Sequence, residues 1–279
     1  MMEFRTPVKI DSAPFSIPPF ERMLFVGSCF ADHIGRKFLE EKFEAVVNPY
    51  GVMYNPASIW HTVERCGESP NVAVMTLGTN RVYLLKSSGE IVDNCRKRPA
   101  HLFEERSLTI DECVDYLSRS VDILIERNPS VKVIITVSPI RYAKYGFHGS
   151  QLSKATLLLA ADRVVSKYSD CMVYFPAYEI VNDELRDYRF YQPDMLHPTE
   201  QTVDYIWQRL SEAFFHADTH TFIKEWKPIK NVLAHRPFDA QSEAYKELMA
   251  KTINSIRQLE KKYGRSLSMV FSDEIDGKW

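Results

Sequence analysis

The sequence lacks the features typical of disulfide-stabilised, nucleic-acid-binding and membrane proteins. Its 279 residues include only five cysteines, scattered and without a Cys-x-x-Cys pair, so we expect free thiols in a reducing compartment. The formal net charge of −2 leaves no broad basic field that would attract nucleic acid. No apolar run approaches the roughly 20 residues that span a bilayer, and residues 1–15 lack the apolar centre of a signal peptide. We therefore expect a cytoplasmic protein with no nucleic-acid or membrane partner.

The composition is that of an ordinary globular protein, with 45% hydrophobic and 26% charged residues. Apolar runs of strand length alternate with helical patterns as far as residue 215. The runs that indicate buried strands are 23–26, 44–48, 72–79, 131–139 and 172–176. This alternation predicts an α/β fold, in which a mainly parallel sheet is covered by helices on both faces as a three-layer α/β/α sandwich.

Two segments depart from the alternation. A hairpin pattern with Gly89 in its turn occupies the region 81–108, which we interpret as an insertion. Residues 218–279 contain charged helical patterns and end in a segment that we expect to be irregular. We therefore expect a main domain of residues 1–217 and a C-terminal helical appendage of residues 218–279, whose helices are a candidate surface for homo-oligomer formation.

Chemically competent residues follow the first and last predicted strands, whose carboxyl ends meet in one crevice of such a sheet. Ser28 and Cys29 come directly after Gly27, at a helix start where unpaired N–H groups stabilise an oxyanion or a thiolate. Asp194 precedes His197 by three residues, a spacing that lets the carboxylate orient the imidazole as in a catalytic triad. His197 could then activate either the hydroxyl or the thiol. The plainer alternative is that Ser28 caps a helix and Asp194 caps a turn.

Three motifs together resemble those of the GSCFA family, which is grouped with the SGNH, or GDSL-like, hydrolases. They are "GSCFA" after the first strand, "LGTN" after the third and "DMLHP" before the last helix of the main domain. The resemblance extends over about residues 5–215 and implies a flavodoxin-like, SGNH-hydrolase-like sheet. In the wider SGNH group, the serine of a Gly-Asp-Ser block attacks an acyl carbon. Its N–H, a glycine N–H and an asparagine amide hold the oxyanion, and an Asp-x-x-His motif supplies base and orienter.

Placed on this pattern by its glycine, "GSC" puts Ser28 where the wider group has Asp and Cys29 where it has the attacking Ser. Neighbouring side chains point apart, so both cannot face His197. The resemblance therefore favours Cys29 as the nucleophile, with His197 as general base and Asp194 as its orienter. A Cys–His pair of this kind would carry the acyl group as a thioester.

The resemblance also implies substrate-binding residues. Gly51 and Asn80 match the two oxyanion blocks, with Tyr54 and Asn55 as alternatives for the N–H donor. The segment "HGSQLSK" would line the same mouth, and it contains His148, Ser153 and Lys154. Ser153 and Lys154 would bind a substrate oxygen or carboxylate, or else belong to a capped helix with a solvated lysine.

We therefore predict an SGNH-like acyl hydrolase or acyltransferase acting on acyl esters of carbohydrates or small molecules. We expect no cofactor and no metal, because no pair of His or Cys residues shows metal-ligand spacing. The alternative is a non-catalytic carbohydrate-binding module on the same fold.

Overall fold

The computed structural model describes residues 5–267, apart from residues 12, 96 and 240. The chain divides into two compact units, Met1–Ala217 and Asp218–Trp279. The tail expected to be irregular falls largely on 268–279, outside the described residues.

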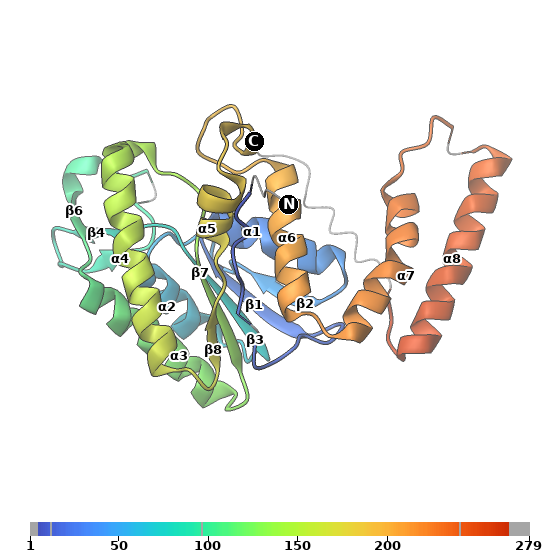
Figure 1. Cartoon of the computed structure of the whole chain (residues 1–279), viewed down its shortest axis with the longest axis horizontal. Helices are drawn as coiled ribbons and strands as arrows, with labels where there is room; N and C mark the ends of the chain where they lie inside the picture. The colour runs from blue at the N-terminus through green and yellow to red at the C-terminus, as the bar shows by residue number, and fades with distance from the viewer. Residues whose placement is uncertain (1–4, 12, 96, 240, 268–279) are drawn as a thin grey trace. The chain divides into compact units, whose positions relative to one another are not determined.

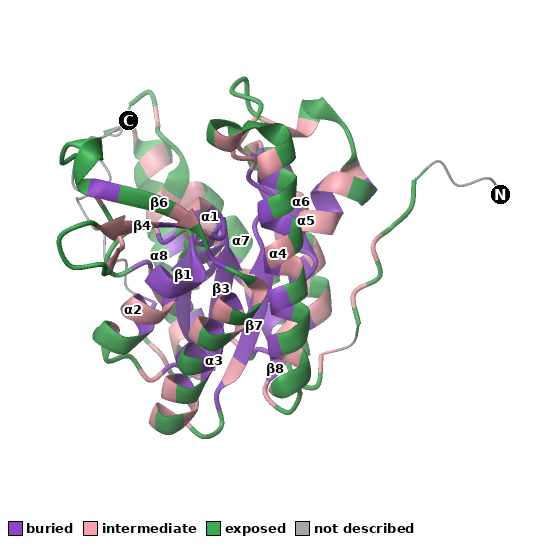
Figure 2. Ribbon diagram, turned by 90° about the vertical axis from the view of Figure 1, so that its left-hand side faces the viewer, coloured by how far each residue is buried: buried purple, intermediate pink, exposed green. Residues whose placement is uncertain are grey.

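The first unit is built on a five-stranded sheet whose strands all pair in parallel, in the order β2-β1-β3-β7-β8. The bounds are β1 Arg22–Gly27, β2 Glu44–Val47, β3 Val72–Leu77, β7 Lys132–Val137 and β8 Met172–Tyr174. All six residues of β3 are buried, as expected of a strand covered on both faces (Figure 2). This order is the flavodoxin-like one, so the predicted α/β class and parallel sheet are confirmed.

Helices cover both faces of this sheet (Figure 1). Helices α2, α3 and α4 pack on one another over one face, and α1 packs near α6 over the other. The bounds are α1 Cys29–Glu40, α2 Pro56–Cys66, α3 Ile110–Arg127, α4 Gly146–Lys167, α5 Ala177–Glu179 and α6 Glu200–Phe214. Short helical turns are η1 Ala100–Leu102, η2 Ala143–Tyr145, the π-helical η3 Ile180–Leu185 and η4 Tyr188–Phe190. The three-layer arrangement is therefore the one that the sequence predicts.

The region 81–108 forms a small antiparallel sheet of its own, in the order β5-β4-β6. Strand β4 is Arg81–Leu85, β5 is Ile91–Val92 and β6 is Phe103–Ser107. The hairpin of β4 and β5 lies at the predicted position. The third strand was not predicted, because the charged sequence "FEERS" has no alternation of apolar and polar residues.

Two glycines let α1 lie close to the sheet. Gly27 has φ of +143°, and a Cβ atom there would lie 2.2 Å from the carbonyl oxygen of Thr76. A Cβ atom on Gly35 would lie 2.6 Å from a methyl group of Val47. The end of β1 and the start of α1 are therefore fixed against β3 by close backbone packing.

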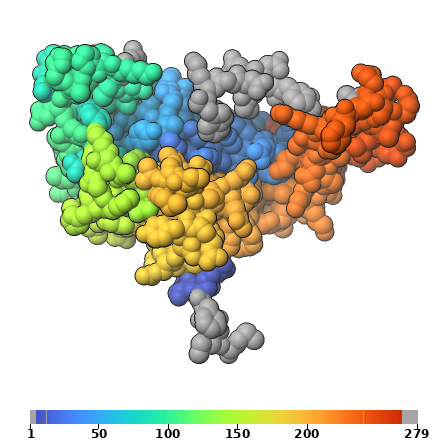
Figure 3. Space-filling view, turned by 90° about the horizontal axis from the view of Figure 1, so that it is seen from above, coloured from blue at the N-terminus to red at the C-terminus, as the bar shows by residue number. Residues whose placement is uncertain are grey.

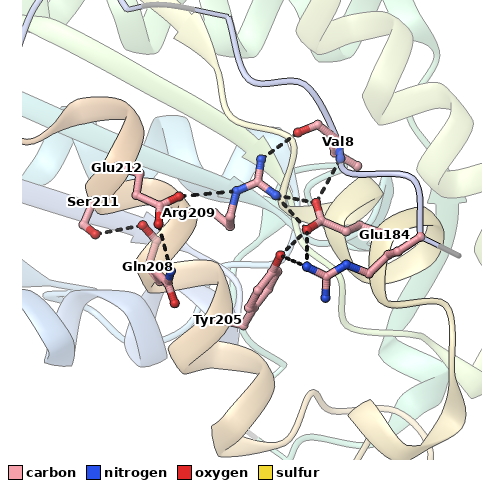
Figure 4. Close-up of polar contacts among 8 residues, drawn as sticks. Val8, Glu184, Tyr205, Gln208, Arg209, Ser211 and Glu212 are labelled. Carbon is pink, nitrogen blue, oxygen red and sulfur yellow. Dashed lines mark hydrogen bonds and ion pairs between the residues drawn. The ribbon is translucent and has the colours of Figure 1, made fainter. Parts of the chain in front are cut away.

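The buried carboxylate of Glu184 joins the N-terminal segment to α6 (Figure 4). Glu184 accepts the N–H of Val8 at 2.9 Å and the guanidinium of Arg209 at 2.5 Å, and it also accepts the hydroxyl of Tyr205. Arg209 in turn donates to the carbonyl of Val8 at 2.7 Å. Burial alone would raise the pKa of Glu184, but these donors outweigh it and hold that pKa below its ordinary value.

The second unit contains α7, Ala217–Ala234, and α8, Glu243–Tyr263. The ring of Phe222 meets the ring of Tyr263 edge to face, with centroids 5.2 Å apart. Lys262 forms an ion pair of 2.6 Å with Glu225. These contacts pack the two helices together. In the part of the chain that the structure describes, no helix is both long and apolar enough to cross a membrane.

Candidate functional site

Ser28 is held by hydrogen bonds within the protein. It is the N-cap of α1, and its hydroxyl accepts the N–H of Phe30 at 3.3 Å and lies 2.9 Å from the hydroxyl of Thr76. The N–H of Ser28 also bonds to Thr76. The residue is fully buried. Ser28 therefore joins α1 to β3, and its hydroxyl is not presented to a substrate.

Cys29 is the first residue of α1 and is partly exposed. Its sulfur lies 3.7 Å from the hydroxyl oxygen of Tyr54, which is within hydrogen-bond distance for sulfur. Burial raises the pKa of the Cys29 thiol, the charge of Asp32 raises it further, and the bond from Tyr54 opposes this. The surroundings of Cys29 therefore favour the neutral thiol over the thiolate.

Asp194 and His197 form the pair that their spacing predicts. One oxygen of the Asp194 carboxylate accepts the backbone N–H groups of Leu196 at 2.8 Å and His197 at 3.0 Å. The other oxygen lies 2.6 Å from Nδ1 of His197. The backbone N–H of His197, followed by its ring, lowers the pKa of Asp194 to about 2. A carboxylate that is ionised throughout the neutral range therefore orients the imidazole.

The loop that carries this pair leads into α6, which packs near α1. Burial and the charge of Arg36 lower the pKa of His33, and the charge of His197 lowers it further, so the two imidazoles are close enough for their charges to interact. His33 is four residues after Cys29 on α1, and therefore lies on the same helix face one turn away. Cys29 and His197 make no hydrogen bond to one another in the described structure. The thiol of Cys29 and the ring of His197 instead bond to Tyr54 and Asp194, respectively.

Arg141 supports the Asp194–His197 loop from the other side. Its backbone N–H donates to the carbonyl of Leu196 at 3.0 Å, and its guanidinium donates to the carbonyl of Met195 at 2.9 Å. The guanidinium also lies 4.1 Å from the centre of the Phe147 ring and 5.4 Å from that of Tyr191. The segment after β7 therefore holds the loop in place.

Gly51 and Asn80, to which the resemblance assigns oxyanion donors, use their donors elsewhere. The N–H of Gly51 bonds to the carbonyl of Asn48 at 2.8 Å. The amide nitrogen of Asn80 donates to the carbonyl of Leu108 at 2.7 Å, and the residue is buried. Asn80 therefore anchors the segment that precedes α3, and the structure brings neither donor to Cys29.

On α4, Ser153 is buried and His148 is exposed. The hydroxyl of Ser153 accepts the backbone N–H of Asn80 at 2.9 Å and lies 3.0 Å from the hydroxyl of Thr79. It is buried, so it joins α4 to the loop after β3. His148 is exposed in the first turn of α4, and the structure does not place it with Cys29 or the Asp194–His197 pair.

Lys154 is buried, so the expected alternative of a solvated lysine is wrong. It is 2% exposed, and its ammonium donates to the carbonyls of Gly78 at 2.8 Å and Ser138 at 2.6 Å. These carbonyls follow β3 and β7. Among the described residues, no carboxylate lies within ion-pair distance of it. Burial lowers the pKa of Lys154 to about 7.

Three residues near Cys29 were not predicted as site side chains: His33, Tyr54 and Tyr142. The spacing of His33, four residues after Cys29, is a signal that could have identified it. Only the backbone of Tyr54 was considered, and Tyr142 was given no role of its own in the segment "TVSPIRY", which also resembles the GSCFA family. The positions of the two tyrosines depend on how separate loops pack, which no local pattern encodes.

A pocket of about 250 Å³ shares Arg141 with the Asp194–His197 loop, and its lining does not include Cys29, Asp194 or His197. Figure 3 shows the loop region (gold) next to α4 (yellow-green). Arg141, Tyr188 and Tyr191 line the pocket together with Gln151 and Asn182. Among the residues that the structure describes, no group of three or more His, Cys, Asp or Glu side chains could hold a metal ion.

Several solved structures have a similar fold at low sequence identity. A candidate GDSL-like lipase from Parabacteroides merdae is 12% identical, with 72% of this chain and 100% of that chain covered and a TM-score of 0.49. A catalytic mutant of an acetylxylan esterase from Geobacillus stearothermophilus is 11% identical, with coverages of 72% and 98% and a TM-score of 0.47. A carbohydrate esterase of family 3 from Talaromyces cellulolyticus is 12% identical, with coverages of 68% and 95% and a TM-score of 0.41.

No curated protein matches the chain by sequence. The model of the GSCFA family matches residues 22–70 and 62–210, which include both the Ser28–Cys29 junction and the Asp194–His197 loop. The model of the C-terminal domain of GSCFA domain proteins matches residues 226–276. The chain therefore belongs to the GSCFA family.

Proposed function

We propose that this protein is an acyl hydrolase or acyltransferase in which Cys29 is the nucleophile, acting on acyl esters of small molecules or carbohydrates. The observation that carries the proposal is the 2.6 Å contact between the Asp194 carboxylate and Nδ1 of His197, on the loop that leads into α6, which packs near the helix that begins with Cys29. A carboxylate on Nδ1 holds the proton there and leaves Nε2 able to accept one, as a general base requires.

The chemistry that follows is covalent acyl transfer. His197 accepts the thiol proton of Cys29, the sulfur attacks the ester carbonyl, and the leaving alcohol takes the proton from His197. Water or an acceptor alcohol then attacks the thioester. The resting thiol and imidazole are not hydrogen-bonded to one another, and such contacts commonly tighten only when substrate binds.

The pocket that shares Arg141 with the Asp194–His197 loop is the support for a small-molecule substrate. Tyr188 and Tyr191 present aromatic surface there, while Arg141 and Gln151 supply polar groups. A concave site that combines aromatic walls with a few polar groups is typical of ligand pockets.

The test is hydrolysis of p-nitrophenyl acetate by the wild type and by single variants. We expect Cys29→Ala and His197→Ala to lower kcat/KM by at least about 10³-fold. Ser28→Ala should remain active, although loss of the helix cap should lower stability by about 1 kcal/mol. Cys171→Ala is the matched control, because Cys171 is a partly buried thiol preceding β8, at the opposite edge of the sheet. Equal activity in all these variants would reject the site.

One observation favours a second candidate, a carbohydrate-binding module without catalysis. The Cys29 thiol makes no bond to His197, and burial raises its pKa. Saturable glycan binding, together with no labelling of Cys29 by an acylating probe, would support this alternative against the enzyme.

A further inference from the structure

We propose that the side-chain hydroxyl of Tyr54 is a catalytic group of this site. It donates a hydrogen bond to the sulfur of Cys29 in the resting protein and to the substrate's carbonyl oxygen once that oxygen becomes negatively charged. This inference rests on the proposed acyl-transfer function, and it assigns to Tyr54 the part that an asparagine amide plays in the wider SGNH group.

The first support is position. The hydroxyl oxygen of Tyr54 lies 3.7 Å from the sulfur of Cys29. In the tetrahedral adduct, the oxyanion is separated from that sulfur only by the attacked carbon, so a donor already at the sulfur needs little movement to reach the oxyanion. Tyr54 is 41% exposed, so an ester that approaches the thiol from solvent also approaches the hydroxyl. Donors placed where charge develops are commonly the largest single contribution to this kind of catalysis.

The second support is that hydrogen bonds hold the backbone of Tyr54 rigidly. The carbonyl of Tyr54 accepts two N–H groups from the loop after β3, from Gly78 at 3.0 Å and from Thr79 at 2.7 Å. The next residue, Asn55, caps α2 through the N–H of Ser58 at 3.0 Å. The backbone of Tyr54 is therefore fixed to the sheet on one side and to a helix on the other, and little reorganisation is left for the reaction step.

The third support is the packing of the ring. Tyr142 meets the Tyr54 ring at 89° with centroids 6.1 Å apart. Its own hydroxyl is buried and has no hydrogen-bond partner in the described structure. A Cβ atom on Gly78 would lie 2.4 Å from that hydroxyl, so only glycine leaves room for it. A buried polar atom without a partner is costly, and the ring that carries it packs on the Tyr54 ring, which fits Tyr142 being a positioning residue for Tyr54.

The fourth support is that the alternative donors are engaged. Gly51 donates to Asn48, and Asn80 donates to Leu108. The Tyr54 hydroxyl is also a lasting donor, because burial raises the pKa of Tyr54 to about 12. It therefore keeps its proton across the neutral range.

The step balances without a further reactant. The thiol proton passes to Nε2 of His197, the sulfur–carbon bond forms, and the carbonyl π pair moves onto oxygen. The Tyr54 hydroxyl and the N–H at the start of α1 hydrogen-bond that oxygen and transfer no proton. When the carbonyl re-forms, the ester carbon–oxygen bond breaks, and the leaving oxygen takes the proton from His197.

The test compares Tyr54→Phe with the wild type, and it uses Tyr50→Phe as the matched control. Tyr50 lies four residues earlier, is 49% exposed, and its hydroxyl bonds only to the carbonyl of Arg65 among described partners. We expect Tyr54→Phe to lower kcat on p-nitrophenyl acetate by about 10²–10³-fold with little change in KM. Tyr50→Phe should behave like the wild type.

A second measurement distinguishes a chemical role of the Tyr54 hydroxyl from a role of the Tyr54 ring in packing alone. The rate of Cys29 alkylation by iodoacetamide, followed by peptide mass spectrometry across pH, reports the thiol pKa. Loss of a donor to the thiolate should move the midpoint to higher pH in Tyr54→Phe, while the Cys171 midpoint stays fixed.

The outcomes distinguish the two proposals. An active wild type with unchanged kcat and an unchanged Cys29 midpoint in Tyr54→Phe overturns the role of Tyr54 and leaves the proposed function standing. A wild type that hydrolyses no ester and forms no acyl-cysteine overturns the function, and the catalytic role falls with it.

Discussion

At the scale of the residue, hydrogen bonds within the protein distinguish the candidate site residues from one another. Sequence reasoning identified Ser28 and Cys29 as candidates but could not separate them by their own chemistry. The structure separates them through a residue distant in sequence, because Thr76 on β3 occupies both the hydroxyl and the N–H of Ser28. Cys29, one position further, faces Tyr54 and remains partly exposed.

Asp194→Asn tests the orienting role of the carboxylate. The amide cannot hold the imidazole in the same tautomer, so we expect kcat/KM to fall by about 10³–10⁴-fold in p-nitrophenyl acetate kinetics, with an unchanged circular dichroism spectrum. Because the pKa of Asp194 is about 2, the wild type should show no activity transition from this carboxylate between pH 4 and 8. The stability that the group contributes is present above its unfolded pKa of about 3.9 and is lost as the pH falls through about 2. Activity within threefold of the wild type would contradict the role.

Lys154 gives a prediction about stability and pH. The folded protein releases its proton near pH 7, whereas the unfolded chain keeps it to about pH 10.4. The unfolded state therefore binds more protons between these values, and wild-type stability should rise with pH by up to about 1.4 kcal/mol per pH unit. Lys154→Met lacks this titration. Urea unfolding should therefore show that the free energy of unfolding of the wild type, relative to that of Lys154→Met, is larger at pH 9 than at pH 7. A difference that does not depend on pH would mean that the carbonyls of Gly78 and Ser138 hold the ammonium in its charged form.

At the scale of the element, the junction of β1 and α1 sets the position of Cys29, the proposed nucleophile. Gly27→Ala would place a Cβ atom 2.2 Å from the carbonyl oxygen of Thr76, at a φ of +143°. We expect a loss of roughly 3 kcal/mol or more in the free energy of unfolding. Gly51→Ala is the control, since it also has positive φ, +90°, but nothing lies within 4 Å of the added atom. It should cost only about 1 kcal/mol of backbone strain. Similar urea midpoints for the two variants would show that the close packing at Gly27 is unimportant.

The strands and helices of the main sheet could be predicted because each carries its own signal. Buried runs such as that of β3 and the capping box at Thr109 are local patterns. Strand β6 could not be predicted, since its charged residues become a strand only by pairing with β4. The donors at Gly51 and Asn80 were assigned by resemblance, and their actual partners come from other loops.

At the scale of the whole molecule, the parallel sheet explains why residues far apart in sequence meet. The segments after β1, β3 and β7 all begin at the carboxyl ends of neighbouring strands, so Cys29, Gly78 and Tyr142 can contribute to one site. The Asp-x-x-His motif could be predicted as a pair, but its distance from the thiol could not, because it depends on a long loop after β8. Self-association through the C-terminal helices stays a prediction, which sedimentation of the full chain would test.

The central claim is that Cys29 carries an acyl group. The most direct measurement is mass spectrometry of the wild-type protein quenched at low pH during reaction with p-nitrophenyl acetate, followed by peptide mapping. The account predicts an acetyl thioester on the peptide containing Cys29, removed by neutral hydroxylamine and absent in Cys29→Ala and His197→Ala. Ester turnover with no acetyl group on Cys29, or with the group on Ser28, would contradict it.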